Sequence, residues 1–345
     1  MPRDLGALRA MGAPVLAGPQ SKCNEMEGDW AVTSPVFVIV NPAAGNGAAR
    51  RAWPAVQSRL QALGIRYELE FSQGRMTAES FARQALRAGS ETIVAVGGDG
   101  TISEVVNGFF LKDAPVRPGA RLLIVPAGSS SDIALGLGIP AGAAAVDLIW
   151  DGQLTSIDVG RAAFVEDGRP TVRFFLNSAD IGLGARIAHR AAGLKWAGGR
   201  LAFLVSSLRS LIDAEAWSGS VQIDDGPLEP IHALTALVAL GPYTGAGMQV
   251  APGAKWDDGV FDLVVIDDMP RIELLRSFSR VYDGTLLSHP RVHHHTGRKI
   301  LIEVGPGGAT GKTAVALELD GETVGSGGAE FRILPAALQV FVPKP

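Results

Sequence analysis

The first half of the chain alternates short apolar runs with segments of helical periodicity. Val36–Val40 is a continuous apolar, mostly branched run, as expected for a strand buried on both faces. Trp53, Val56 and Leu60 then recur at helical spacing until Gly64 marks the end of a helix. The alternation continues with predicted strands at Tyr67–Phe71, Thr92–Val96 and Leu122–Val125 and helices at Thr77–Ala88, Ile102–Phe109 and after Asp132. Strands that alternate with helices predict a parallel sheet with helices on both faces.

The pattern changes after about Asp151. Short apolar runs separated by Gly, Pro or Asp now dominate, and they predict a mostly antiparallel β domain. These runs are Phe174–Leu176, Val221–Ile223, Leu234–Leu240, Val260–Ile266, Ile300–Val304, Ala314–Leu319 and Phe331–Leu334. Helical stretches interrupt them near Gly199–Ile212 and Arg271–Tyr282. We therefore expect a loose extension (1–33), an α/β domain (34–155), a β-rich domain (156–330) and a C-terminal segment (331–345) that could pack back on the first domain.

Composition narrows the class of protein. The chain has 345 residues, of which 47% are hydrophobic and 19% charged, and this balance is typical of a folded globular protein. The net charge of -4 gives no general attraction for nucleic acid. A single cysteine, Cys23, excludes an internal disulfide and suits a reducing compartment. No apolar run reaches the roughly 18 residues of a membrane span, so we expect a cytoplasmic protein.

Three glycine-containing loops follow predicted strands, at Asn41–Gly47, Gly97–Thr101 and Ala127–Asp132. Parallel α/β sheets bind their ligands at the carboxyl ends of strands, where glycines let phosphate approach the free N–H groups of helix N-termini. Asp99 and Asp132 would repel bare phosphate, so carboxylates in these loops indicate a cation such as Mg²⁺ between them and the phosphate. The loops therefore predict a metal–phosphate site.

The sequence GGDGTISEVVNGF, at Gly97–Phe109, resembles the nucleotide-binding signature of the diacylglycerol kinase catalytic domain. Bacterial lipid kinases and sphingosine and ceramide kinases share this signature. Further stretches resemble other blocks of the family in the same order, from about Val36 to Val342: VNPAAGNG, PAGSSSDIALGLGIP, IDVGR, FFLNSADIGLGA, GAGMQVAPGAKWDDGVFDLVVI and ELDGE. Several ordered blocks are far more specific than one glycine-rich loop.

The resemblance implies a fold and an activity. The fold is a three-layer α/β domain of the NAD kinase and diacylglycerol kinase type, followed by a β-sandwich-like domain, with a cleft between the two. The activity is transfer of a phosphoryl group from ATP, with Mg²⁺, to a lipid hydroxyl. Such an enzyme meets its lipid at the inner membrane face as a peripheral protein, and it could be an oligomer.

The resemblance also implies roles for individual residues. Glu322, with Asp320 beside it, is the expected base that takes the proton from the lipid hydroxyl. Asp99 and Asp132 face the phosphates and the catalytic metal. A second, mainly structural Mg²⁺ is expected at the carbonyls of Lys255 and Val260 and the carboxylate of Asp258. The expected nucleotide contacts are Asn41, Pro42, Ala43, Ala44, Gly45, Ser72, Gly97, Gly98, Asp99, Gly100, Thr101, Glu104, Gly128 and Ser129.

The chain departs from the family pattern around the nucleotide. Ser129 keeps the hydroxyl of the usual threonine, whereas Ser131 and Leu240 replace asparagines and Leu135 replaces an arginine. Two rival functions therefore stay open. One is a phosphotransferase that resembles NAD kinase, although the downstream blocks DDGVFDLVVI and LDGE favour the lipid family. The other is a non-catalytic protein that binds lipid or nucleotide.

Two clusters of basic or histidine residues complete the candidates. His293–His295 resembles a metal cluster, but adjacent residues of a strand cannot all face one ion, so we expect a strand or loop edge. A segment from Arg186 to Leu204 could present a basic rim and an apolar face to a membrane, or it could be a helix packed on the core. The sequence does not distinguish these two interpretations of the segment.

Overall fold

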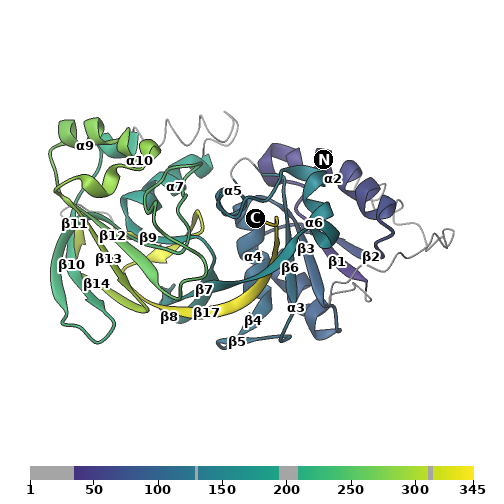
Figure 1. The fold of residues 1–345 in the computed structure, drawn as a ribbon. Helices are drawn as coiled ribbons and strands as arrows, with labels where there is room; N and C mark the ends of the chain where they lie inside the picture. Colours follow the sequence, from purple (N-terminus) through teal and green to yellow (C-terminus); the bar gives the residue numbers. More distant parts are fainter. Residues whose placement is uncertain (1–34, 129–130, 194–208, 310–313) are drawn as a thin grey trace, which may run out of the picture.

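The structure is a computed structural model that describes residues 35–128, 131–193, 209–309 and 314–345. The expected N-terminal extension, Cys23 and Ser129 lie outside the described residues, as does most of the helix predicted at Gly199–Ile212. An α/β half and a β-rich half lie side by side (Figure 1).

The α/β half is built on a parallel sheet in the order β2–β1–β3–β6. The strands are β1 (Val36–Val40), β2 (Tyr67–Phe71), β3 (Thr92–Gly97) and β6 (Arg121–Pro126). Most side chains of β1, β3 and β6 are fully buried. Burial on both faces explains why these strands read as continuous apolar runs rather than as alternating ones.

Helices cover both faces of this sheet. Right-handed crossovers place α2 on one face of the sheet and α3 and α4 on the other. On the first face α2 packs against η1, and on the second α3 packs against α4. The helices are α2 (Ala44–Ala62), α3 (Thr77–Arg87), α4 (Asp99–Phe109), α5 (Asp132–Gly136), η1 (Gly142–Asp147) and α6 (Leu148–Asp151). A short hairpin of β4 (Phe110–Leu111) and β5 (Ala114–Pro115) follows α4.

Two long strands join the halves. They are β7 (Gln153–Glu166) and β17 (Ala329–Val342), which pair with each other along most of their length (Figure 1). At its end β17 pairs in parallel with β6, where Gln339 lies opposite Arg121. At its start β17 pairs with β14. One strand therefore belongs to the sheets of both halves.

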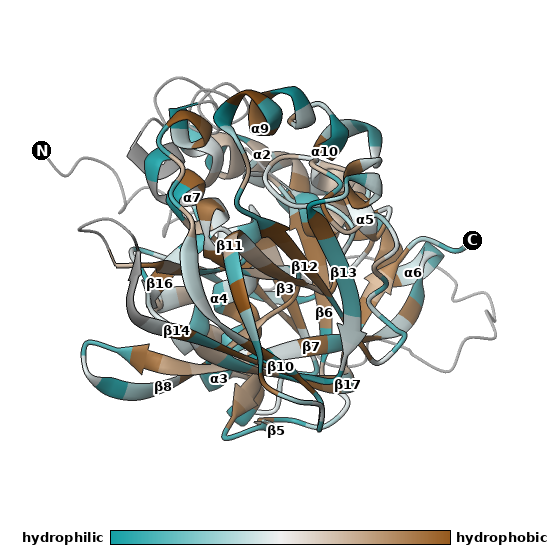
Figure 2. Cartoon of the chain, turned by 90° about the vertical axis from the view of Figure 1, so that its left-hand side faces the viewer, coloured by the Kyte–Doolittle hydropathy of each residue, from teal (hydrophilic) through white to brown (hydrophobic). Residues whose placement is uncertain are grey.

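The second half is a mostly antiparallel β structure with helices over one face. Figure 2 shows α7, α9 and α10 above strands β11 and β12. The strands are β8 (Arg169–Phe175), β9 (Ser178–Gly182), β10 (Trp217–Ile223), β11 (Glu229–Ala239), β12 (Phe261–Asp267), β13 (Val292–Gly297), β14 (Lys299–Ala309), β15 (Ala316–Leu319) and β16 (Glu322–Ser326). The helices are α7 (Leu183–Gly193), α9 (Arg271–Ser277), α10 (Arg280–Asp283) and η3 (Leu286–Ser288).

The predicted fold class is confirmed, with an α/β half followed by a β-rich half. Several boundaries differ. Helix α4 begins at Asp99 instead of Ile102, because Gly98 is extended and the acidic residue after it suits a helix N-terminus. The helix predicted at Arg271–Tyr282 is broken into α9 and α10.

The two basic or histidine clusters have ordinary structural positions. His293–His295 lies on β13, which pairs with β12 alone among the described strands, so the predicted strand edge is confirmed. In the described part of α7, Leu183 and Ile187 are buried in the core. Arg190 of the same helix forms an ion pair with Asp213. The remainder of the basic segment, including Lys195 and Arg200, lies outside the described residues.

Candidate active site

The three glycine-containing loops meet at the carboxyl edge of the parallel sheet. Asn41 directly follows β1, and its Nδ2 donates to Thr101 Oγ1 of the second loop over 3.0 Å. Gly45, at φ 59°, lies so close to the third loop that a Cβ would be 3.0 Å from the carbonyl carbon of Gly128. Both the positive φ and this approach favour glycine. The loops thus form one continuous rim with the N-terminus of α4.

Most of the predicted nucleotide contacts belong to this rim. Ser72 follows β2, where its N–H donates to the Val40 carbonyl. The predicted contacts on the rim are Asn41, Pro42, Ala43, Ala44, Gly45, Gly97, Gly98, Asp99, Gly100, Thr101 and Gly128. They lie at or beside the N-terminus of α4, and helix N-termini are sites that bind phosphate.

Asp99 and Asp132 hold the rim to other elements. The Oδ2 of Asp99 accepts the backbone N–H of Asp132 at 3.0 Å, and its Oδ1 accepts that of Ile133 at 3.4 Å, so Asp99 caps the start of α5. Asp132 is buried and accepts the N–H of Ala246, from the β-rich half, at 2.8 Å. Each carboxylate oxygen has a second lone pair. Both residues therefore stabilise the loops, and carboxylate oxygens of this kind are hard ligands that suit Mg²⁺.

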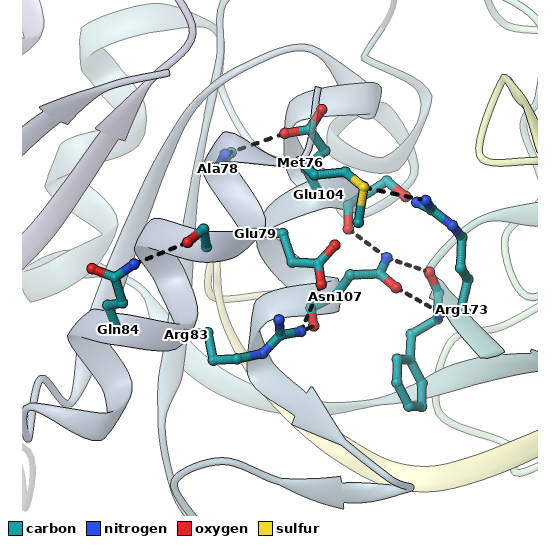
Figure 3. Close-up of polar contacts among 11 residues, drawn as sticks. Met76, Ala78, Glu79, Arg83, Gln84, Glu104, Asn107 and Arg173 are labelled. Carbon is teal, nitrogen blue, oxygen red and sulfur yellow. Dashed lines mark hydrogen bonds and ion pairs between the residues drawn. The ribbon is translucent and has the colours of Figure 1, made fainter. Parts of the chain in front are cut away.

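Glu104 lies on α4 and faces α3. Its Oε2 accepts the N–H of Ala78 at 3.3 Å (Figure 3). Burial, followed by repulsion from Glu322 and Glu79, raises the pKa of Glu104, and backbone N–H groups of Met76 and Ala78 partly oppose this. Repulsion from Glu322 means that a carboxylate of the β-rich half lies near this helix.

Glu322 approaches the glycine loop from the β-rich half. It is the first residue of β16, and a Cβ on Gly100 would lie 3.0 Å from its Oε1. A bulkier residue at position 100 would displace the carboxylate. Arg75 lies 3.8 Å from Oε2, but both side chains are solvent-exposed, so this contact contributes little.

Asp320 is buried two residues before Glu322. Its carboxylate accepts three backbone N–H groups from the turn between β8 and β9, those of Leu176, Asn177 and Ser178, at 3.0, 2.8 and 3.2 Å. Burial raises the pKa of Asp320 to about 6, against the effect of these donors. This geometry fixes the hairpin that carries Glu322 and leaves Glu322 as the carboxylate that lies next to Gly100.

An apolar cavity of about 130 Å³ lies between the sheet of the β-rich half and its helices. Met269, Leu274 and Phe278 are among its apolar lining residues, and Glu318 and Gly321, which come shortly before Glu322 in the chain, also line it. Gly245 also lines it, next to the Ala246 N–H that binds Asp132. The cavity lining is therefore mostly apolar with a few polar groups, which fits a molecule with a polar head and an alkyl chain.

Two further buried carboxyls line the cavity. Asp180 on β9 and Glu318 on β15 are direct cross-strand neighbours. Thr235 Oγ1 donates to Asp180 over 2.6 Å. Burial raises the pKa of Asp180 to about 6, and burial together with repulsion from Asp180 raises the pKa of Glu318 well above its ordinary value.

These raised pKa values predict a pH dependence of stability. An unfolded aspartate ionises near pH 4, whereas Asp180 in the folded chain ionises at about 6, so the folded state binds the proton more tightly. The stability associated with the proton is lost as the pH rises through 6. Lowering the pH from 7.5 to 5 should therefore stabilise the protein by about 1 kcal/mol through Asp180. Urea unfolding of wild type and Asp180→Asn at both pH values isolates this gain; equal gains in the two proteins would refute it.

The residues expected at a second metal site lie on an exposed turn before β12. Asp258 Oδ1 accepts the Val260 N–H at 3.2 Å, and Gly259 donates to Asp158 of β7 at 2.8 Å. Lys255 is exposed at the start of the turn. In the described part of the chain, no three His, Cys, Asp or Glu residues surround a common metal position. One carboxylate and two carbonyls are hard oxygen ligands that suit Mg²⁺. The second metal site stays a prediction.

Sequence reasoning overlooked several residues of the cleft. Ser103 and Asn107 on α4 contact the β-rich half, and Asp180 and Glu318 line the cavity. Asp180 lies in SADIG, whose residues are all buried although two are polar. Such a strand has neither an alternating nor an apolar pattern. The available signal was the position of Asp180 inside the block FFLNSADIGLGA, which resembles the family.

Two family models cover most of the chain. Residues 35–162 match the diacylglycerol kinase catalytic domain, and residues 177–342 match the YegS C-terminal NAD kinase beta sandwich-like domain. A diacylglycerol kinase of Staphylococcus saprophyticus is 27% identical over 308 residues, which are 89% of this chain and 94% of that protein. A diacylglycerol kinase of Mycobacterium tuberculosis is 27% identical over 313 residues, 90% of this chain and 95% of that protein.

Solved structures share the fold. A putative diacylglycerol kinase from Bacillus anthracis superposes with a TM-score of 0.73 at 23% identity, over 92% of this chain and 98% of that one. Yeast NADH kinase complexed with NADH gives a TM-score of 0.52 at 12% identity, over 90% and 84%. With both halves matched in order by the two family models, and with relatives of that name aligned along most of its length, the chain belongs to the diacylglycerol kinase catalytic-domain family of kinases.

Proposed function

We propose that this kinase transfers the γ-phosphoryl group of ATP to the hydroxyl of a lipid. The observation that carries the proposal is the position of Glu322, which lies against Gly100 of the phosphate rim and beside an apolar cavity. The closeness of this carboxylate to the glycine-containing rim and to residues that line an apolar cavity supports the proposal. Diacylglycerol or a related amphiphile fits this arrangement.

The chain's own residues account for the chemistry. Glu322 takes the proton as the lipid hydroxyl oxygen bonds to the γ-phosphorus, while the bond to the β-phosphate oxygen breaks and ADP leaves. Asp99 and Asp132 are the residues that would hold Mg²⁺, and their hard carboxylate oxygens at the phosphate rim suit that ion. The bound ion would neutralise phosphate charge. The rim and cavity hold the reactants in line.

A phosphotransferase that acts on NAD is the second candidate, because the yeast NADH kinase shares the fold. The apolar cavity favours a lipid over a polar dinucleotide. The midpoint temperature of thermal unfolding should rise by a few degrees when ATP and Mg²⁺ are added. NAD under the same conditions should change that temperature little. A larger shift with NAD, together with NADP formation from NAD and ATP, would support the second candidate and exclude the first.

The proposed lipid acceptor implies contact with a membrane surface. In the residues that the structure covers, no helix has the length and apolarity to cross a bilayer. We therefore expect weak vesicle binding, with an electrostatic part that falls as salt rises and an apolar part that does not. Co-sedimentation with anionic vesicles at 0.05 and 0.5 M salt measures both parts. Tight partition into detergent without added lipid would contradict the expectation.

A further inference from the structure

One face of α4 contacts the β-rich half at three successive positions. Gly100, Ser103 and Asn107 are spaced by three and four residues, so they lie on the same side of the helix. Gly100 lies against Glu322, the Ser103 hydroxyl bonds to Asp320, and Asn107 bonds to β8. The helix that carries the phosphate rim at its N-terminus is thus joined along its length to the elements that carry Glu322.

Asn107 makes the most demanding of these contacts. Its Nδ2 donates to the Phe174 carbonyl at 2.8 Å, and its Oδ1 accepts the Phe174 N–H at 2.9 Å. The same Nδ2 donates to the Ser103 carbonyl at 2.8 Å (Figure 3). Among the described strands β8 pairs with β7 alone, so Asn107 satisfies backbone groups on its free edge. An amide side chain carries a donor and an acceptor side by side, which suits the C=O and N–H groups of one residue.

The contact continues from Phe174 to Glu322. The buried Asp320 carboxylate accepts three successive N–H groups, and the first of them belongs to Leu176, two residues after Phe174. Asp320 and Gly321 form a two-residue turn with φ of 49° and 85°, after which Glu322 pairs with Leu319. Each link is a buried hydrogen bond or a tight turn. Movement of Phe174 away from α4 would therefore move the turn that carries Glu322.

We propose that Asn107 is a positioning residue that sets the distance between Glu322 and the phosphate rim, with Ser103 as a second link. The inference rests on the proposed function of Glu322. Asn107 touches neither the rim nor the cavity, so it acts through β8 and Asp320. A residue that only stabilises the fold would affect activity whether or not Glu322 is present. The effect of Asn107 on activity must instead depend on Glu322.

Asn107→Asp tests the proposal with almost no change in size. A carboxylate would face the carbonyl oxygens of Phe174 and Ser103 and could donate to neither. We expect kcat for lipid phosphorylation to fall about 10- to 100-fold while KM for ATP stays within about twofold. In a Glu322→Gln background the same substitution should have little further effect on kcat, because the group that it positions is gone. A similar loss in both backgrounds would show a merely structural role.

Hydrogen exchange supplies a readout that does not require activity. In Asn107→Asp the amides of Phe174, Leu176–Ser178 and the Asp320–Glu322 turn should all exchange faster. Faster exchange at Phe174 alone would contradict the proposed connection between Asn107 and the Glu322 turn, even if Glu322 is the base. Should Glu322→Gln leave transfer unchanged, Glu322 is not the base, and exchange still decides the connection. Gln57→Glu is the matched control, since Gln57 donates to the Tyr67 hydroxyl at 2.9 Å inside the α/β half; it should change neither readout.

Discussion

Glu322→Gln should lower lipid phosphorylation by roughly two to four orders of magnitude, the usual range for loss of a general base. Glutamine keeps the size of the side chain and its contact with Gly100 but cannot take a proton. ATP affinity should stay near the wild-type value, because the base contacts the acceptor. Initial rates at saturating ATP, together with ATP titration by calorimetry, separate these two quantities.

Glu303→Gln is the control for charge removal, because Glu303 is an exposed carboxylate on β14 outside the cavity. It should have wild-type turnover. Wild-type turnover in Glu322→Gln itself would exclude Glu322 as the base. Asp320 would be a poor replacement, since three backbone N–H groups already occupy its buried carboxylate.

Asp99→Asn should remove most metal-dependent turnover, on the order of a hundredfold or more, because a carboxylate that holds Mg²⁺ at the phosphates contributes several kcal/mol. The amide oxygen can still accept one of the two N–H bonds at the start of α5. The fold should therefore persist with a modest loss of stability, typical of a weakened cap. Turnover across a Mg²⁺ titration, with circular dichroism and thermal unfolding, measures both effects.

Asp225→Asn serves as the control, since Asp225 is exposed in the turn between β10 and β11. An Asp99→Asn enzyme with unchanged turnover and unchanged Mg²⁺ dependence would mean that Asp99 only caps α5. That outcome would leave Asp132 as the remaining carboxylate of the rim able to hold the ion.

The parallel sheet was predictable because its strands are buried on both faces. Val36–Val40 forms β1 with the predicted bounds, since an uninterrupted apolar run of this length suits a central strand. The glycine loops were predictable for a different local reason. Gly45 has a positive φ, a backbone conformation that glycine adopts more readily than other residues. Local sequence determines such features.

The contacts across the cleft were not predictable from local patterns. Asn107 looks like an ordinary polar residue near a helix end, and its role depends on Phe174, which lies 67 positions later in the chain. Asp180 and Glu318 become neighbours only through strand pairing. The buried polar strand β9 has no apolar pattern, so sequence periodicity could not identify it.

Transfer of labelled phosphate from ATP to lipid tests the central claim most directly. Wild-type enzyme with γ-labelled ATP and Mg²⁺ is offered diacylglycerol and other long-chain alcohols in mixed micelles, with NAD in a parallel reaction. The account predicts a labelled product that extracts into organic solvent, requires Mg²⁺ and is nearly absent with Glu322→Gln. Label in NADP, or no labelled product from any lipid while ATP still binds, would contradict it.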